Sequence, residues 1–95
     1  MTTTLTSKVK VRNLVSKSGR EVPNQFEIKA NGCRYFQSYN SIIVKIDSNS
    51  QVYLDEYYWN YSNTTSKYRN QFLYEDTKTT KEKIKSGEYI LTDLN

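Results

Sequence analysis

The stretch QFEIKANGCRYFQS, residues 25–38, decides the fold of this chain. Its centre is Asn31-Gly32, a pair that tolerates positive φ at both positions and is the strongest short signal for a β-hairpin. The residues before this pair alternate with period 2, which directs Phe26 and Ile28 inward and Glu27 outward. We therefore predict a strand over residues 25–29 that returns over residues 33–38.

Strand patterns also flank this hairpin on both sides. Residues 8–12, KVKVR, alternate cations with valines, as a half-buried strand does. Residues 42–46, IIVKI, are the most apolar run in the chain and predict a central strand, and residues 51–54 follow it after a turn. A last short strand is predicted over residues 89–92. The first half of the chain is thus predicted to be an antiparallel sheet of about five strands.

The pattern becomes helical between the fifth and the last predicted strand. Ser62 or Thr65 is a suitable cap for a helix that runs through residues 66–73. Thr77 or Thr79 is a suitable cap for a second helix, because Thr79 and Glu82 have the spacing of a capping box. Gly87 is expected to end that helix. The predicted fold class is α+β, with one domain over residues 8–95 behind a flexible lead-in over residues 1–7.

Composition argues for a binding protein and against an enzyme. The 95 residues include no histidine and one cysteine, so the commonest general base and the commonest metal ligand are missing. We expect no metal and no cofactor, and we interpret the pairs Asp55-Glu56 and Glu75-Asp76 as solvated or helix-flanking acids. Cys33 is expected to face the core, since free cysteine is among the most buried residue types.

An aromatic segment, residues 53–61, is the densest feature that could bind a partner. Five of its nine residues, YLDEYYWNY, are aromatic, and tyrosine and tryptophan dominate binding hot spots and stack on unpaired bases. The simpler interpretation is that these rings fill the seam between sheet and helices. The candidate binding residues are Tyr57, Tyr58, Trp59 and Tyr61.

Basic side chains form the second candidate. The net charge is +4, and the three lysines 78, 81 and 85 follow a helical spacing that places them on one side of the second helix. A solvated helix face explains them without a ligand, whereas a stripe that contacts phosphates is the functional interpretation. The candidate residues are Lys67, Arg69, Lys78, Lys81 and Lys85, and the cations of residues 8–12 could extend them.

Several runs of this sequence resemble a family of small uncharacterised bacteriophage proteins. The runs are SGREVPNQF (18–26), YFQSY (35–39), YWNYS (58–62), TTSKYRNQFL (64–73) and KIKSGEY (83–89). The resemblance covers about residues 9–95. It implies phage origin and action in a bacterial host, but it assigns no activity and no site residues.

These observations lead to two functional hypotheses. The first is nucleic-acid binding, with basic side chains on the backbone and aromatic rings on the bases. The second is inhibition of a host protein, with the aromatic segment as the hot spot. We expect no membrane partner, because no apolar run approaches the length of a span and no signal peptide precedes the domain. The expected location is therefore the bacterial host cytoplasm, and the sequence does not indicate an oligomeric state.

Overall fold

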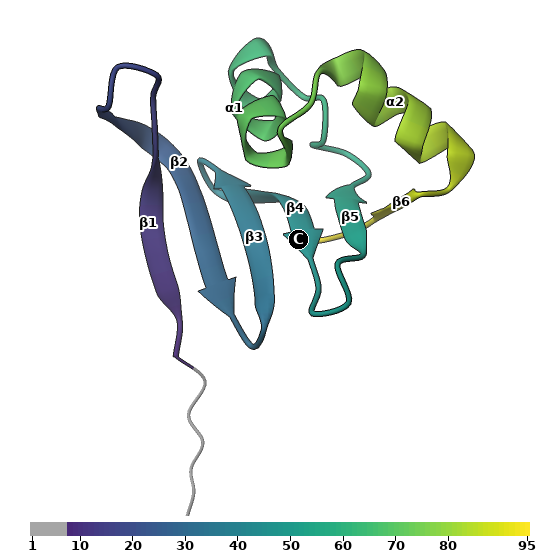
Figure 1. The fold of residues 1–95 in the computed structure, drawn as a ribbon, viewed down its shortest axis with the longest axis horizontal. Coiled ribbons are helices and arrows are strands. Elements are labelled where there is room, and N and C mark those ends of the chain that lie inside the picture. Colours follow the sequence, from purple (N-terminus) through teal and green to yellow (C-terminus); the bar gives the residue numbers. More distant parts are fainter. Residues whose placement is uncertain (1–7) are drawn as a thin grey trace, which may run out of the picture.

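The computed structural model describes residues 8–95, which form one six-stranded sheet and two helices (Figure 1). The strands are β1 (Lys10–Val15), β2 (Glu21–Ala30), β3 (Cys33–Ser38), β4 (Ser41–Ile46), β5 (Val52–Asp55) and β6 (Tyr89–Thr92). The helices α1 (Asn63–Leu73) and α2 (Thr77–Ser86) lie between β5 and β6 in the chain. The predicted α+β class is confirmed, while the predicted lead-in over residues 1–7 lies outside the described residues.

The sheet follows chain order from one edge to the other. Strands β1 to β5 are antiparallel neighbours, and β6 pairs with β5 in parallel. Parallel neighbours require a crossover connection, which α1 and α2 provide. β1 and β6 are therefore the two edges of the sheet.

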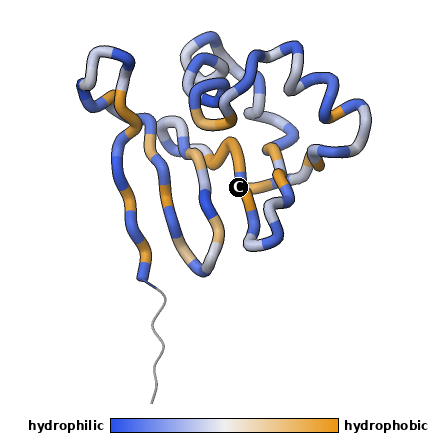
Figure 2. The backbone as a smooth tube through the Cα atoms, in the orientation of Figure 1, coloured by the Kyte–Doolittle hydropathy of each residue, from blue (hydrophilic) through white to orange (hydrophobic). Residues whose placement is uncertain are grey.

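The core lies between the helices and the second half of the sheet. Phe36, Val44 and Leu54 have an exposed fraction of 0%, and the ring of Phe72 from α1 lies 5.8 Å from that of Phe36. In Figure 2, orange gathers on β4 and β5, whereas both helices are mostly blue and white. The helices are thus held in place by a few apolar contacts and, as shown below, by buried polar groups.

The predicted facing of the first strands is wrong. Glu27 is 5% exposed and lies on the face that α1 covers, whereas Phe26 and Ile28 lie on the opposite face and are half-buried. The register explains this, because Glu27 pairs with the buried Phe36 and directly opposed residues share a face. The predicted alternation of β2 is present, but alternation alone does not determine which face of the sheet the helices cover.

Strand β1 departs from its prediction in the same way. It runs over Lys10–Val15 instead of residues 8–12, and Val9 and Val11 are 62% and 59% exposed. β2 also begins earlier than predicted, at Glu21, so Pro23 lies inside it. Pro23 is tolerated there because pairing with β3 starts only at Gln25.

The helix ends confirm two of the predicted caps and correct one. Ser62 caps α1 by accepting a hydrogen bond from the Thr65 N–H at 3.1 Å, and Gly87 ends α2 in a left-handed conformation. Asp76, and neither Thr77 nor Thr79, caps α2, since its carboxylate accepts from the Thr79 N–H at 2.8 Å. Within residues 8–95, neither helix has the length and apolar character needed to cross a bilayer.

Candidate nucleic-acid interface

A row of three cations crosses the first three strands of the sheet. Lys10 of β1 pairs with Lys29 of β2, and Lys29 pairs with Arg34 of β3. Like charges directly opposite each other destabilise a sheet. A row of this kind therefore does not add to the stability of the sheet.

Arg12 belongs to the same surface through a shared carboxylate. The Arg12 Nε and Nη2 donate to Glu27 Oε1 at 3.1 and 2.8 Å, and the Arg34 Nε donates to Glu27 Oε2 at 2.9 Å. The Glu27 side chain is only 6% exposed, whereas those of Arg12 and Arg34 are 73% and 44% exposed. Glu27 thus fixes both guanidinium groups while leaving much of each open to solvent.

The electrostatics of Glu27 fit this role. Burial alone would raise the pKa of Glu27, but the hydrogen bonds from Arg12 and Arg34 outweigh burial and hold the pKa below its usual value. Glu27 is therefore ionised near neutral pH. We call Lys10, Arg12, Lys29 and Arg34 the basic patch. Its four cations surround this one carboxylate, which leaves a net charge of +3.

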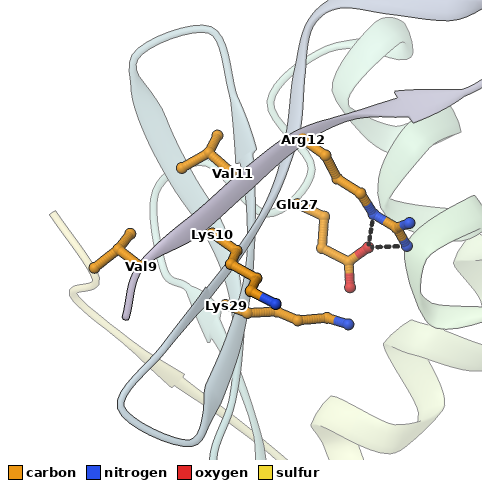
Figure 3. A pocket seen from close by; sticks show the side chains of 6 residues that line it. All are labelled: Val9, Lys10, Val11, Arg12, Glu27 and Lys29. Atoms are coloured by element: carbon orange, nitrogen blue, oxygen red, sulfur yellow. Dashed lines mark hydrogen bonds and ion pairs between the residues drawn. The ribbon is translucent and has the colours of Figure 1, made fainter. Parts of the chain in front are cut away.

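The basic patch lies beside a surface hollow on β1 and β2. The hollow has a volume of about 540 Å³ and is lined by Val9, Lys10, Val11, Arg12, Glu27 and Lys29. In Figure 3, the polar members of this set project to one side of β1, and Val9 and Val11 project to the other. The two sides of the same strand thus carry different chemistry.

Lys29 and Arg34 of the basic patch were not among the predicted binding residues. A signal for them was present, because a two-residue turn at Asn31-Gly32 places residue 29 opposite residue 34. Their common face could not be related to Arg12, since that relation depends on the β1–β2 register. A register shift between Asn13 and Val15 interrupts the pairing of those two strands.

The aromatic segment is divided between seam and surface. Tyr58 and Trp59 are half-buried and pack against the core, as the simpler interpretation expected. Tyr57 and Tyr61 are 74% and 71% exposed. The Asp55 carboxylate shapes the turn, because its Oδ2 accepts from the N–H groups of Tyr57 and Tyr58 at 3.1 and 2.9 Å.

Arg69 is a structural residue, and its predicted place on a basic surface is wrong. It has an exposed fraction of 0%, and its guanidinium carbon lies 5.2 Å from the centre of the Trp59 ring. Its N–H groups donate to the Trp59 carbonyl, to Asn60 Oδ1 at 3.2 Å and to Thr77 Oγ1 at 2.8 Å. Burial lowers the pKa of Arg69, and the charge of Glu75 partly opposes that shift. Arg69 thus joins the aromatic segment to both helices.

The other predicted cations are exposed but do not extend the basic patch. Lys67 lies over the Tyr68 ring at 5.2 Å, and Lys78, Lys81 and Lys85 are exposed along α2. α2 packs against β6, and β6 and β1 are opposite edges of the sheet. The cations of the first strand, which could have extended the lysines of the second helix, therefore form a separate group.

The acidic pairs combine buried and exposed members. Asp55 is 0% exposed and also accepts from Leu94 N and Asn95 Nδ2, so it holds the end of the described chain against the sheet. Glu75 accepts from Thr80, Lys83 and Tyr89 at 2.6, 2.9 and 2.8 Å. The solvated interpretation is wrong for these two carboxylates, whereas the helix-flanking interpretation holds for Asp76.

These carboxylates are occupied by structural contacts. Burial would raise the pKa of Asp55 and of Glu75, but their hydrogen bonds lower both values. Burial, followed by the contact with Glu75, raises the pKa of Tyr89 to about 12. Among residues 8–95, no three histidine, cysteine or carboxylate side chains come close enough to hold a metal ion. The only cysteine, Cys33, is half-buried. It shares the face of Tyr35, away from the helices, so the prediction that it faces the core is wrong.

Residues 9–88 match a family of unknown function, DUF8033. The chain belongs to the DUF8033 family. The match begins one residue before β1 and ends at Glu88, so the DUF8033 region includes the basic patch, the aromatic segment and both helices. No curated protein and no solved structure matches the chain. The match ends before β6, which completes the sheet, and the family description assigns no activity.

Proposed function

We propose that this DUF8033 protein binds nucleic acid through the basic patch. The observation that supports the proposal is the row Lys10, Lys29 and Arg34 on three neighbouring strands. The sequence keeps these like charges directly opposite one another despite their repulsion. Negatively charged phosphate groups would relieve that repulsion. Each phosphate that contacts a cation also releases condensed counterions from the nucleic acid, which favours binding.

Other features support binding as the mode of action. The buried carboxylates Glu27, Asp55 and Glu75 each accept several hydrogen bonds, so the described residues offer no free buried acid for general acid–base chemistry. We propose that the protein is phage-encoded and non-enzymatic, and that it acts in the host cytoplasm. The resemblance to phage proteins supports the proposed origin.

Binding to a labelled oligonucleotide tests this proposal. The double variant Lys10→Gln/Lys29→Gln removes two cations that make no hydrogen bond in the described structure, so the fold should persist. We expect its affinity to fall roughly tenfold at about 50 mM salt, and its log–log salt slope to decrease by about 2. The matched control, Lys81→Gln/Lys85→Gln, removes the same charge from α2 and should bind within about twofold of wild type. Equal losses in both variants, or wild-type affinity that does not respond to salt, would contradict the proposal.

A second candidate function, inhibition of a host protein, is favoured by a different surface. The face of the sheet away from the helices carries Val9, Val11, Phe26, Ile28 and Tyr35. A contiguous group of apolar side chains on a surface marks a protein-binding site more often than scattered single apolar residues do. We name these five residues the outer face.

A pull-down from nuclease-treated bacterial lysate separates the two functions. A host protein retained by wild type and by Lys10→Gln/Lys29→Gln, but lost with Val9→Ser/Val11→Ser, supports the inhibitor. Salt-sensitive oligonucleotide binding without such a protein supports nucleic-acid binding.

A further inference from the structure

A second hollow lies between the first strands and the end of α1, next to the basic patch. Its volume is about 340 Å³, at the small end of the range of about 300 to 1,000 Å³ for small-molecule sites. Arg12 and Arg34 line one side, and Phe72, Gln71 and Tyr74 line the other. We call this hollow the Tyr74 cleft. It combines two cations with the exposed ring of Tyr74, the two kinds of group that hold a nucleotide.

Tyr74, which lines the cleft, has an unfavourable backbone conformation. It follows the last residue of α1 in the left-handed conformation, with φ 57° and ψ 44°, and its N–H donates to the Asn70 carbonyl. The corresponding position after α2 is Gly87, the residue type that adopts this conformation without steric penalty. Tyrosine is unfavourable in this conformation. Tyr39 also adopts it, with φ 55°, so Tyr74 differs in its place beside Arg12 and Arg34.

Packing does not explain the position of Tyr74. Tyr74 is 93% exposed, so its ring packs against little of the described structure. The ring is therefore available to a ligand that enters the cleft beside Arg12 and Arg34.

The opposite wall of the cleft is already organised for an anion. Glu27 accepts from two nitrogens of the Arg12 guanidinium and from one nitrogen of the Arg34 guanidinium. The remaining N–H groups of both side chains are available to a ligand. The Arg34 guanidinium also lies 4.8 Å from the centre of the Phe72 ring, which fixes its plane. The Gln71 amide donates to the Val15 carbonyl at 2.7 Å and ties the end of α1 to the edge strand.

We propose that the Tyr74 cleft holds one unpaired nucleobase stacked on Tyr74, with the flanking phosphates on Arg12 and Arg34. The ligand of the basic patch is then single-stranded nucleic acid. In a duplex both faces of an internal base are covered by its neighbours, whereas an unpaired base offers a face to an aromatic side chain. This inference rests on the proposed nucleic-acid binding and names its substrate class.

Fluorescence anisotropy with a labelled oligothymidylate, and with a duplex of the same length, tests the inference on the full chain. The variant Tyr74→Gly removes the ring and also relieves the positive φ, so folding should not be impaired. We expect this variant to lose between about fivefold and a hundredfold in affinity for the single strand, the range that one stacked base contributes. Tyr74→Phe keeps the ring and should stay within about twofold. Tyr39→Gly removes another exposed tyrosine in the left-handed conformation, outside the cleft, and should also stay within about twofold.

The outcomes separate this inference from the function on which it rests. Salt-dependent binding that Lys10→Gln/Lys29→Gln weakens and Tyr74→Gly leaves unchanged would overturn the stacked base and keep the nucleic-acid function. Equal affinity of wild type for duplex and single strand would also overturn the inference alone. Absence of binding to both oligonucleotides would overturn both proposals.

Discussion

Arg69 shows how much of the stability of this small domain depends on one polar residue. Its guanidinium contacts the Trp59 ring and donates to groups on the aromatic segment and on Thr77. Burial of a charge is unfavourable, so these contacts must compensate for it. Removing the side chain would leave a cavity and several unpaired acceptors among Trp59, Asn60 and Thr77.

We predict that Arg69→Ala lowers the free energy of unfolding by roughly 3 kcal/mol, since it disrupts a buried hydrogen-bond network. Chemical denaturation followed by Trp59 fluorescence measures the change. Lys67→Ala, on the exposed side of the same helix, should alter stability by less than about 0.5 kcal/mol. A small effect at Arg69 would mean that its contacts contribute little beyond the cost of burial.

Lys29, unlike Arg69, is expected to lower the stability of the fold. It lies between Lys10 and Arg34 in the sheet and has no acidic partner among the described residues. Replacing it by glutamine should remove two repulsions while keeping the stem. We predict that Lys29→Gln raises the free energy of unfolding by about 0.2 to 1 kcal/mol, the usual size of a cross-strand pair effect. The gain should shrink at high salt, and a destabilised variant would contradict the idea that the row serves binding.

At the scale of the elements, the cap of α2 differs from its prediction. Asp76 accepts from the Thr79 N–H, so Thr79 occupies the third helical position and is not the cap. Its backbone hydrogen bond with Asp76 also lowers the pKa of Asp76. The capping-box spacing of Thr79 and Glu82 is therefore coincidental.

We predict that Asp76→Ala costs about 1 kcal/mol of unfolding free energy, the typical contribution of an N-terminal cap. Thr79→Ala should cost less than about 0.5 kcal/mol, because it keeps the backbone N–H that makes the main contact with the Asp76 carboxylate and loses only the weaker side-chain contact. Thermal denaturation monitored by far-ultraviolet circular dichroism compares the two. The reverse order of effects would restore the capping box.

The elements were more predictable from sequence than their faces. Local signals suffice for the hairpin at Asn31-Gly32, the cap at Ser62 and the helix end at Gly87, because turn and cap preferences act over a few residues. The position of Glu27 was not predictable, since it depends on which face α1 covers. The same limit applies to the candidate site. Exposure of some tyrosines in the aromatic segment was predictable, because a small core cannot bury all five rings. The basic patch was not predictable, because it requires a β1–β2 register that no local signal sets.

At the scale of the whole molecule, buried carboxylates tie distant parts of the chain together. Asp55 connects β5 to the segment around Leu94, and Glu75 connects the start of α2 to β6 through Lys83 and Tyr89. Glu27 connects β1, β2 and β3. A core with few apolar side chains is thus supplemented by three ionised groups.

These groups make stability sensitive to acid. The pKa values of Glu27, Asp55 and Glu75 in the folded protein lie below the values of 4.5, 3.8 and 4.5 for free side chains. Between the folded and unfolded pKa values, the unfolded chain binds more protons than the folded protein does. The contribution of each carboxylate is therefore complete well above its unfolded pKa and is lost as the pH falls through its folded pKa.

We predict that the free energy of unfolding is nearly constant from about pH 6 to 8 and falls steadily below about pH 5. Denaturant titrations at several pH values measure this profile. Asp55→Asn should cost roughly 2 kcal/mol near pH 7, because it replaces a charged acceptor of several hydrogen bonds, and the difference from wild type should narrow toward pH 3. Glu56→Gln, at the exposed neighbouring position, should leave the profile unchanged. If the Asp55→Asn difference stayed constant with pH, the contribution of Asp55 would come from packing, and the network of ionised carboxylates would not explain the acid sensitivity of the fold.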